Sequence, residues 1–326
     1  MGQCASTKQE NDTDESDDES EIEAEKEREA LELEKIEQIK KMYYDGIPLF
    51  TKDSIRALHQ QLLKAKTGDK VWVLNLDGSK SEFEIEVGKC FNGPGEGIET
   101  VRTQVSIYYQ SIQHLTWSKE NWEFVDFCTM PIHHLTQIRD KVTKEFCGRS
   151  LPRPDLLREE AEAFFRTCCE EWETSEACKQ FRAILDAAKI PVGIAKIVAF
   201  ACGTFSYISQ KPVHSRGISR AATQHALILT VRDVLGKKKD WGSGEIVCYA
   251  QDPVYSELDK EILQQSGIQI LDDPAGFLEV DESAVVLSFC PNVCVRQVVC
   301  DIARPAMMIW DSVILDEDQM EEGRRR

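Results

Sequence analysis

Three short polar segments directly follow apolar runs in the second half of the sequence, and they are the residues best suited to bind a ligand. They are Cys202-Gly203-Thr204-Phe205-Ser206, Gln251-Asp252-Pro253 and Cys290-Pro291-Asn292. A glycine in such a turn lets a ligand approach the backbone, and an acid after a second strand is placed to accept hydrogen bonds from ribose hydroxyls. The segments therefore indicate a nucleotide-type site. The competing interpretation is a structural turn, because Phe205 stands where the Gly-x-Gly-x-x-Gly pattern has its second glycine.

The elements that position these segments are apolar strands alternating with helices. Strands are predicted over Ile197–Cys202, Ile246–Ala250, Ile268–Leu271, Ala284–Phe289 and Met307–Ile309. The clearest helix is predicted over Ser219–Leu235 and closed by Gly236. This alternation is typical of a mostly parallel sheet covered on both faces, so the fold class is a Rossmann-like three-layer α/β domain. In such sheets ligands bind beyond the carboxyl ends of the strands.

The same residues resemble a known family over residues 196–311. The matching motifs are Lys196 to Gly203, Gln224-His225-Ala226-Leu227, Gln251 to Tyr255, Leu263 followed by Gly267-Ile268, and Ser288-Phe289-Cys290-Pro291. This series resembles the Sensitivity To Red Light Reduced-like domain, and the segment from Ser106 to Trp117 resembles the fungal form of the family. The resemblance implies a regulatory or signalling protein of the cell interior that acts through protein partners, without an established reaction.

One departure from the family pattern affects any catalytic role. The family usually has a histidine after the proline that ends the fourth strand, but here Asn292 follows Pro291. Asparagine forms hydrogen bonds but does not exchange a proton near neutral pH. His225 lies within an apolar helical stretch, where a packing role is expected.

Six residues form the predicted ligand site: Gly203, Ser206, Gln224, Asp252, Pro291 and Asn292. The leading function is a regulatory protein that senses a nucleotide-like ligand. The alternative is an S-adenosylmethionine-dependent methyltransferase-like enzyme that uses the same crevice, because its turns resemble those of class I methyltransferases. The missing second glycine and the bulk of Phe205 count against that enzyme. The cofactor is unknown, with S-adenosylmethionine and a nucleotide as the candidates, and no catalytic residue is assigned.

The twelve cysteines do not predict a metal site. No Cys-x-x-Cys occurs, and the nearest candidate set, Cys290, Cys294 and Cys300, has no histidine partner for zinc. In a reducing compartment these cysteines are expected to be mostly buried hydrophobic residues.

The first residues fit a lipidation motif. Met1-Gly2-Gln3-Cys4-Ala5-Ser6 matches the myristoylation pattern, with Gly2 as the acylated residue. One myristoyl chain binds membranes only marginally, so a second signal is needed, and palmitoylation of Cys4 is the candidate. We therefore expect a cytoplasmic protein that contacts membranes only through this acylation, with the nucleus as a further location. The first residues contain no signal-peptide pattern.

Charge and periodicity divide the chain into four parts. The net charge is −18, but residues 10–34 hold 14 acids and 2 bases, so the remaining 43 acids and 37 bases carry only −6. This balance gives no sign of nucleic-acid binding. The predicted parts are a disordered acidic leader (1–29), an α+β region (30–190), the Rossmann-like domain (191–315) and a tail (316–326).

Within the α+β region, the pattern predicts both helices and strands. The predicted elements are a helix from within Glu21–Lys26 to Tyr44, a helix Lys52–Lys66 capped by Thr51, a hairpin of Val71–Leu76 and Glu82–Val87, a strand Val101–Tyr109, and mainly helix over 118–190, best at Asp155–Thr174.

Overall fold

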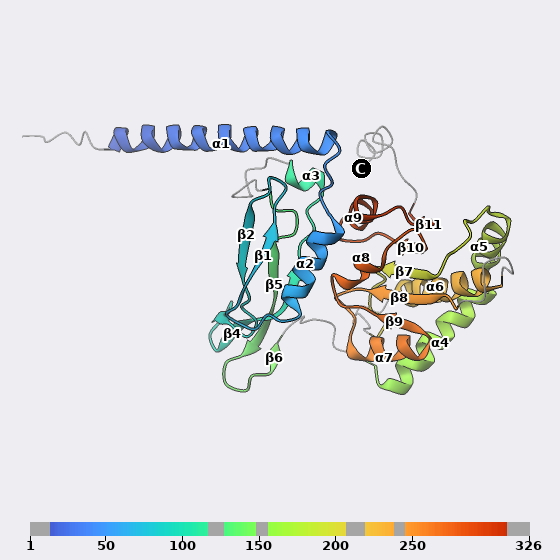
Figure 1. The fold of residues 1–326 in the computed structure, drawn as a ribbon. Coiled ribbons are helices and arrows are strands. Elements are labelled where there is room, and N and C mark those ends of the chain that lie inside the picture. Colours follow the sequence, from blue (N-terminus) through green and yellow to red (C-terminus); the bar gives the residue numbers. More distant parts are fainter. Residues whose placement is uncertain (1–13, 117–126, 148–155, 207–218, 238–244, 312–326) are drawn as a thin grey trace, which may run out of the picture.

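The chain folds into an antiparallel α+β region followed by a parallel α/β region, as seen in a computed structural model (Figure 1). The structure describes residues 14–116, 127–147, 156–206, 219–237 and 245–311. The fold class predicted from the sequence is confirmed, since the second region is a five-stranded parallel sheet with helices on both faces.

The first element, α1, is a long helix over Asp14–Tyr44 that extends away from the rest of the molecule (Figure 1). It begins before the predicted Glu21–Lys26, so the stretch from Asp14 to Glu29, predicted to be disordered, is helical. Glutamate, alanine and lysine are strong helix formers, and acids stabilise the amino end of a helix. The first turns of α1 can therefore form without an apolar face that packs on the rest of the protein. Among the side chains of α1 that the structure describes, Ile36 and Ile39 are buried, and both lie in the second half of the helix. The prediction of disorder for residues 1–13 lies outside the described residues.

Helix α2 and a hairpin follow as the sequence predicts. Helix α2 (Lys52–Leu62) is capped by Thr51, whose side chain accepts a hydrogen bond from the Ser54 amide, although the helix ends before the predicted Lys66. Strands β1 (Lys70–Leu74) and β2 (Lys80–Glu84) pair antiparallel. Because side chains alternate across a strand, the apolar faces of the hairpin turn toward α2 and the core.

The second antiparallel sheet corrects the prediction for residues 118–190. Its strands lie in the order β3 (Cys90–Asn92), β4 (Ile98–Ile107), β5 (Ile132–Asp140) and β6 (Phe146–Cys147). Residues 127–147 were predicted to be mainly helical, and that prediction is wrong. Buried and exposed residues do not alternate along β5, so the two-residue period that predicts a strand is missing. The strand forms because β5 pairs with β4, which lies far earlier in the chain. Residues 117–126 lie outside the described part.

The antiparallel region also contains the short helix α3 (Ile112–Leu115), whereas α4 (Arg158–Thr174) and α5 (Glu176–Ala187) pack with the parallel sheet. The helix predicted over Asp155–Thr174 is confirmed as α4, with its first turn at Arg158.

The parallel sheet contains all five strands that the sequence predicts. They are β7 (Lys196–Phe200), β8 (Val247–Gln251), β9 (Ile268–Ile270), β10 (Ala284–Ser288) and β11 (Met307–Trp310). The described helices between them are α6 (Arg220–Gly236), α7 (Glu257–Gln265), α8 (Ala275–Glu279) and α9 (Val295–Ile302). The spatial order is β9-β8-β7-β10-β11, which is the doubly wound order 3-2-1-4-5. The connections reverse direction between β7 and β10, and this is the switch point of the sheet.

Each face of the parallel sheet packs a separate hydrophobic cluster. Ile197 and Ala199 of β7 face α4, α6 and α7, whereas Val198 and Phe200 face α2, α8 and α9. The antiparallel region packs on the second face. Phe277 of α8 stacks on Phe200 with ring centroids 4.5 Å apart.

No helix among the described residues is both long and apolar enough to cross a lipid bilayer.

Candidate functional site

The turn after β7 lies at the switch point and has an unusual backbone. Ala201 adopts φ 56 and Gly203 adopts φ 76, so both lie in the left-handed region. Glycine accepts this conformation freely, whereas alanine does so only at a cost in free energy. The Ala201 amide donates a hydrogen bond to the Gln251 carbonyl, 3.1 Å away, which continues the pairing of β7 with β8 past the end of the strand.

Asp252, directly after β8, contacts the first turn. Its Oδ2 accepts a hydrogen bond from the Gly203 amide at 2.7 Å, and its Oδ1 accepts one from the Val254 amide at 3.0 Å. Burial raises the pKa of Asp252, while these two backbone donors oppose the rise. The structure thus brings Gly203 and Asp252 together, and the Asp252 carboxylate, half-buried, joins the ends of β7 and β8.

Asp259 was not predicted as a site residue, although it accepts most of the hydrogen bonds that hold the turn after β7. It is fully buried, with 0% of its surface exposed. Its Oδ1 accepts hydrogen bonds from the amides of Phe205 (3.2 Å) and Ser206 (3.0 Å), and its Oδ2 accepts one from Thr204 Oγ1 at 2.6 Å. Oδ2 also accepts from the amide and the hydroxyl of Ser256. The signal was present in the sequence, because Ser256 and Asp259 form the capping box of α7.

Ser206 belongs to this buried network and not to an open crevice. Its side chain is fully buried, and its Oγ lies 2.8 Å from Ser256 Oγ. In this structure Ser206 positions the turn and presents no hydroxyl to solvent. The predicted ligand contact through Ser206 therefore does not fit its surroundings.

Phe205 also points inward. It is 1% exposed and stacks on Phe165 of α4, with ring centroids 4.8 Å apart. The expectation that Phe205 would crowd a cofactor at the first turn is therefore wrong, since the ring fills the core beneath that turn.

Helix α6 begins beside the switch point and contacts the end of β10. Arg220, in its first turn, donates a hydrogen bond from Nη2 to Cys290 Sγ at 3.1 Å. Gln224, one turn later, is half-buried, and its Oε1 is enclosed without a hydrogen-bond partner among the described residues.

The turn after β10, like the turn after β7, carries a left-handed residue that is not a glycine. Cys290 adopts φ 48, and its amide donates to Asp311 Oδ2, which lies just after β11. Pro291 is half-buried and Asn292 is exposed. Pro291 lines a cavity of about 570 Å³ on the β11 side of this turn. The six predicted residues thus divide into the Gly203–Asp252 pair, the buried Ser206, Gln224 on α6, and Pro291 with Asn292 beside the cavity.

His225 is a packing residue and not a proton-transfer group. Burial lowers its pKa to about 4, so the ring is neutral near neutral pH. Nδ1 lies 2.7 Å from the Ala221 carbonyl, which only accepts, so Nδ1 carries the proton. Nε2 then accepts from the Tyr255 hydroxyl at 2.8 Å. Both ring nitrogens are satisfied.

The cysteines behave as small hydrophobic residues where they are buried. Burial raises the pKa of the thiols of Cys202 and Cys294 to about 12, so both stay protonated. Among the described residues, no group of three or more histidine, cysteine or acidic side chains is placed to hold a metal ion.

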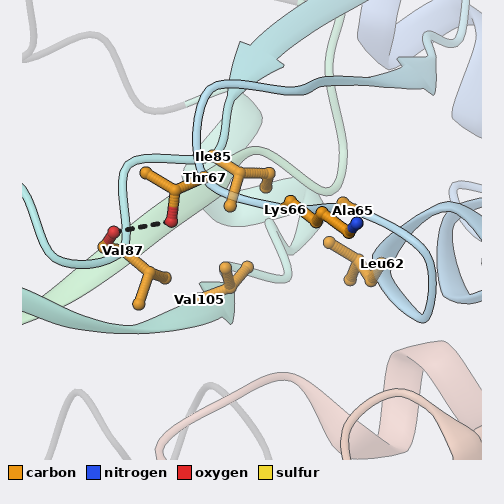
Figure 2. A pocket seen from close by; sticks show the side chains of 7 residues that line it. All are labelled: Leu62, Ala65, Lys66, Thr67, Ile85, Val87 and Val105. Atoms are coloured by element: carbon orange, nitrogen blue, oxygen red, sulfur yellow. Dashed lines mark hydrogen bonds between the residues drawn. The ribbon is translucent and has the colours of Figure 1, made fainter.

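A second cavity, of about 420 Å³, lies away from the parallel sheet, between the end of α2, the end of the hairpin and β4. Figure 2 shows its mainly apolar wall, with Leu62, Ile85, Val87 and Val105, and the hydrogen bond from Thr67 Oγ1 to the Val87 carbonyl at 2.7 Å. None of the predicted site residues lines it.

The fold and the motifs at the strand ends agree with a comparison to protein families. No curated protein matches the chain. Residues 177–326, from α5 onward, match the SRR1 domain. This range includes the parallel sheet and all three polar turns. Residues 177–326 of this chain are therefore an SRR1 domain, the Sensitivity To Red Light Reduced domain that the sequence motifs resemble.

Proposed function

We propose that this protein is a regulatory protein whose SRR1 domain binds a nucleotide-type ligand at the switch point between β7 and β10. The observation that supports this most strongly is the pair of left-handed residues, Ala201 and Cys290, at the ends of these two strands. Strained backbone outside glycine costs free energy and concentrates at ligand sites. In doubly wound sheets of this order the ligand crevice lies at the switch point.

The surrounding groups suit the parts of a nucleotide. Asp252 follows the second strand, where an acid accepts hydrogen bonds from ribose hydroxyls, and each of its oxygens retains a lone pair beyond its backbone bond. Arg220 lies at the amino end of the 17-residue α6, where a positive side chain and the helix dipole both favour an anion. Gln224 adds an acceptor that lacks a donor among the described residues.

Thermal unfolding of the full chain with and without NAD, ATP and S-adenosylmethionine tests this proposal. A ligand at 100 times its Kd stabilises the folded state by about 2.7 kcal/mol, which is visible as a rise in Tm. We expect at least one of the three to raise Tm. If all three leave Tm unchanged, the nucleotide site is wrong.

Arg220→Gln is expected to weaken binding of an anionic ligand about tenfold or more, because it removes a charge-assisted hydrogen bond. The Kd measured by calorimetry checks this. Lys237→Gln is the matched control, since Lys237 is exposed and follows the opposite end of α6. Equal Kd values for the Arg220→Gln variant and the unaltered chain would contradict the placement of the ligand.

The methyltransferase-like enzyme is a second candidate, favoured by one observation. Phe205 leaves the first turn free by packing into the core, so S-adenosylmethionine meets no obstruction from that ring. His225, however, is enclosed and neutral, so it supplies no general base. Transfer of a labelled methyl group from S-adenosylmethionine to a cellular protein or small molecule would favour the enzyme over the sensor.

We propose further that the protein acts in the cytoplasm with protein partners and contacts membranes through acylation of Gly2 and Cys4. Both residues lie outside the described residues. Cys4→Ser is expected to move most of the protein from the membrane fraction to the soluble fraction, because one myristoyl chain alone binds only marginally. Fractionation of cells that express the full chain measures this. Cys90→Ser, which alters an exposed cysteine of the folded part, serves as the control. Unchanged membrane retention of the Cys4→Ser protein would refute the two-signal account.

A further inference from the structure

A cavity of about 570 Å³ lies where the antiparallel region meets the SRR1 domain. Tyr43 of α1 and the segment Ser111–Gln113 form one side, while α9 and the end of β11 form the other. Pockets that bind small molecules have volumes of roughly 300–1,000 Å³ and commonly lie at the contact between domains. The cavity is on the β10–β11 side of the switch point. It shares Pro291 with the proposed nucleotide site, but Gly203 and Asp252 do not line it.

Gln297 belongs to the wall of this cavity, and its side chain contains a hydrogen-bond donor that lacks an acceptor among the described residues. Its Oε1 accepts from the Ile112 amide at 3.2 Å, which fixes the orientation of the side-chain amide. Its Nε2 is fully enclosed and has no hydrogen-bond partner among the described residues. A buried unpaired donor costs free energy, so a ligand that places an acceptor there gains affinity.

Two carboxylates in the wall offer acceptors. Asp301 Oδ2 accepts from the amides of Leu49 (2.9 Å) and Phe50 (3.2 Å), and Asp311 Oδ2 accepts from the Cys290 amide. The second oxygen of each carboxylate accepts no hydrogen bond from the part of the chain that the structure describes. The only cationic side chain in the wall formed by described residues is the exposed Arg296. Two carboxylates against one exposed cation disfavour an anionic ligand.

The wall also contains two aromatic rings, those of Tyr43 and Trp310. Both residues are half-buried, so a flat ring has apolar surface to contact within the cavity. The ligand that fits is therefore planar, uncharged, and able both to accept and to donate hydrogen bonds.

We propose that this cavity binds a nucleoside through its base. Every nucleobase carries ring or carbonyl acceptors, and all also carry N–H donors. A base acceptor receives the hydrogen bond from Gln297 Nε2, and the base or ribose donors face Asp301 and Asp311. A phosphate group would face these carboxylates, so the free nucleoside binds more tightly than its monophosphate. Because the two walls come from different regions, the bound nucleoside joins the antiparallel region to the SRR1 domain.

Binding of adenosine, guanosine, cytidine and uridine to the full chain tests this proposal, measured by thermal unfolding and calorimetry. At least one nucleoside is expected to bind, and its 5′-monophosphate is expected to bind more weakly. Gln297→Glu keeps the acceptor for the Ile112 amide and replaces the donor group with an acceptor, so the Kd should rise about tenfold or more. Gln264→Glu makes the same chemical change on the exposed surface of α7 and should leave the Kd unchanged.

The failures of the two proposals are distinguishable. Arg220→Gln should leave the nucleoside Kd unchanged, because Arg220 lies at α6 and not in the cavity wall. Circular dichroism confirms that each variant folds, and Gln297→Met provides an uncharged variant that also lacks the donor. If no nucleoside binds, or if both Gln297 variants bind as tightly as the unaltered chain, the nucleoside site is wrong whether or not NAD or ATP binds elsewhere.

Discussion

Asp259→Ala is expected to lower the free energy of unfolding by about 3–5 kcal/mol, because it leaves several enclosed donors without an acceptor. The amides of Phe205 and Ser206 and the hydroxyl of Thr204 all donate to this carboxylate, as do the amide and hydroxyl of Ser256. Chemical denaturation near neutral pH measures the loss. The turn after β7 and the first turn of α7 lose their common anchor at the same time.

The neighbouring Glu257→Ala is the matched control, since Glu257 is exposed in the same helical turn. Its free energy of unfolding should change by less than about 0.5 kcal/mol. An Asp259→Ala protein as stable as the control would show that the buried network does not hold the turn.

Asp273→Asn is expected to stabilise the protein increasingly as the pH rises from 4 to 7, relative to the unaltered chain. Burial raises the pKa of Asp273 to about 6, from an ordinary value of 3.8. The folded state therefore binds this proton more tightly than the unfolded state does. The stability from this group is fully present below pH 3.8 and is lost as the pH rises through about 6. The shift corresponds to about 3 kcal/mol, so the difference between variant and unaltered chain should grow by about that amount.

The asparagine can keep both hydrogen bonds of this site. Asp273 Oδ1 accepts from the Tyr109 hydroxyl at 2.6 Å and from Gln251 Nε2 at 2.9 Å, and an amide oxygen accepts in the same way. Asp272→Asn, at the exposed neighbour, controls for the loss of charge. Unfolding measured from pH 4 to 8 gives the comparison. A variant whose stability stays parallel to that of the unaltered chain at every pH would contradict the raised pKa.

The parallel sheet could be predicted because each of its strands is marked by a pattern of neighbouring residues in the sequence. Each of its strands is a short apolar run bounded by polar or turn residues, and α6 begins at the capping residue Ser219 as predicted. Strand β5 could not be predicted in this way, since its conformation depends on pairing with β4, far earlier in the chain. Helix α1 begins earlier than predicted because its first residues have a high helix propensity. The prediction gave more weight to their acidic, weakly apolar composition, which is typical of disorder.

The candidate site could be predicted only in part. The turn residues Gly203 and Asp252 follow from the alternation of strands and helices, and the structure places them in direct contact. Gln297 and Asp301 could not be identified from spacing, because their partners Ile112 and Leu49 lie in the antiparallel region. The packing of that region on the sheet brings these residues together, and no local pattern reports such packing.

The most direct test of the switch-point site is hydrogen–deuterium exchange of the full chain with and without whichever of NAD, ATP or S-adenosylmethionine raises its Tm. We expect slower exchange in peptides that contain residues 201–206, 251–254 and 289–293, where the ends of β7, β8 and β10 meet. Protection confined to other parts of the chain, with these three turns unchanged, would show that the ligand does not bind at the switch point.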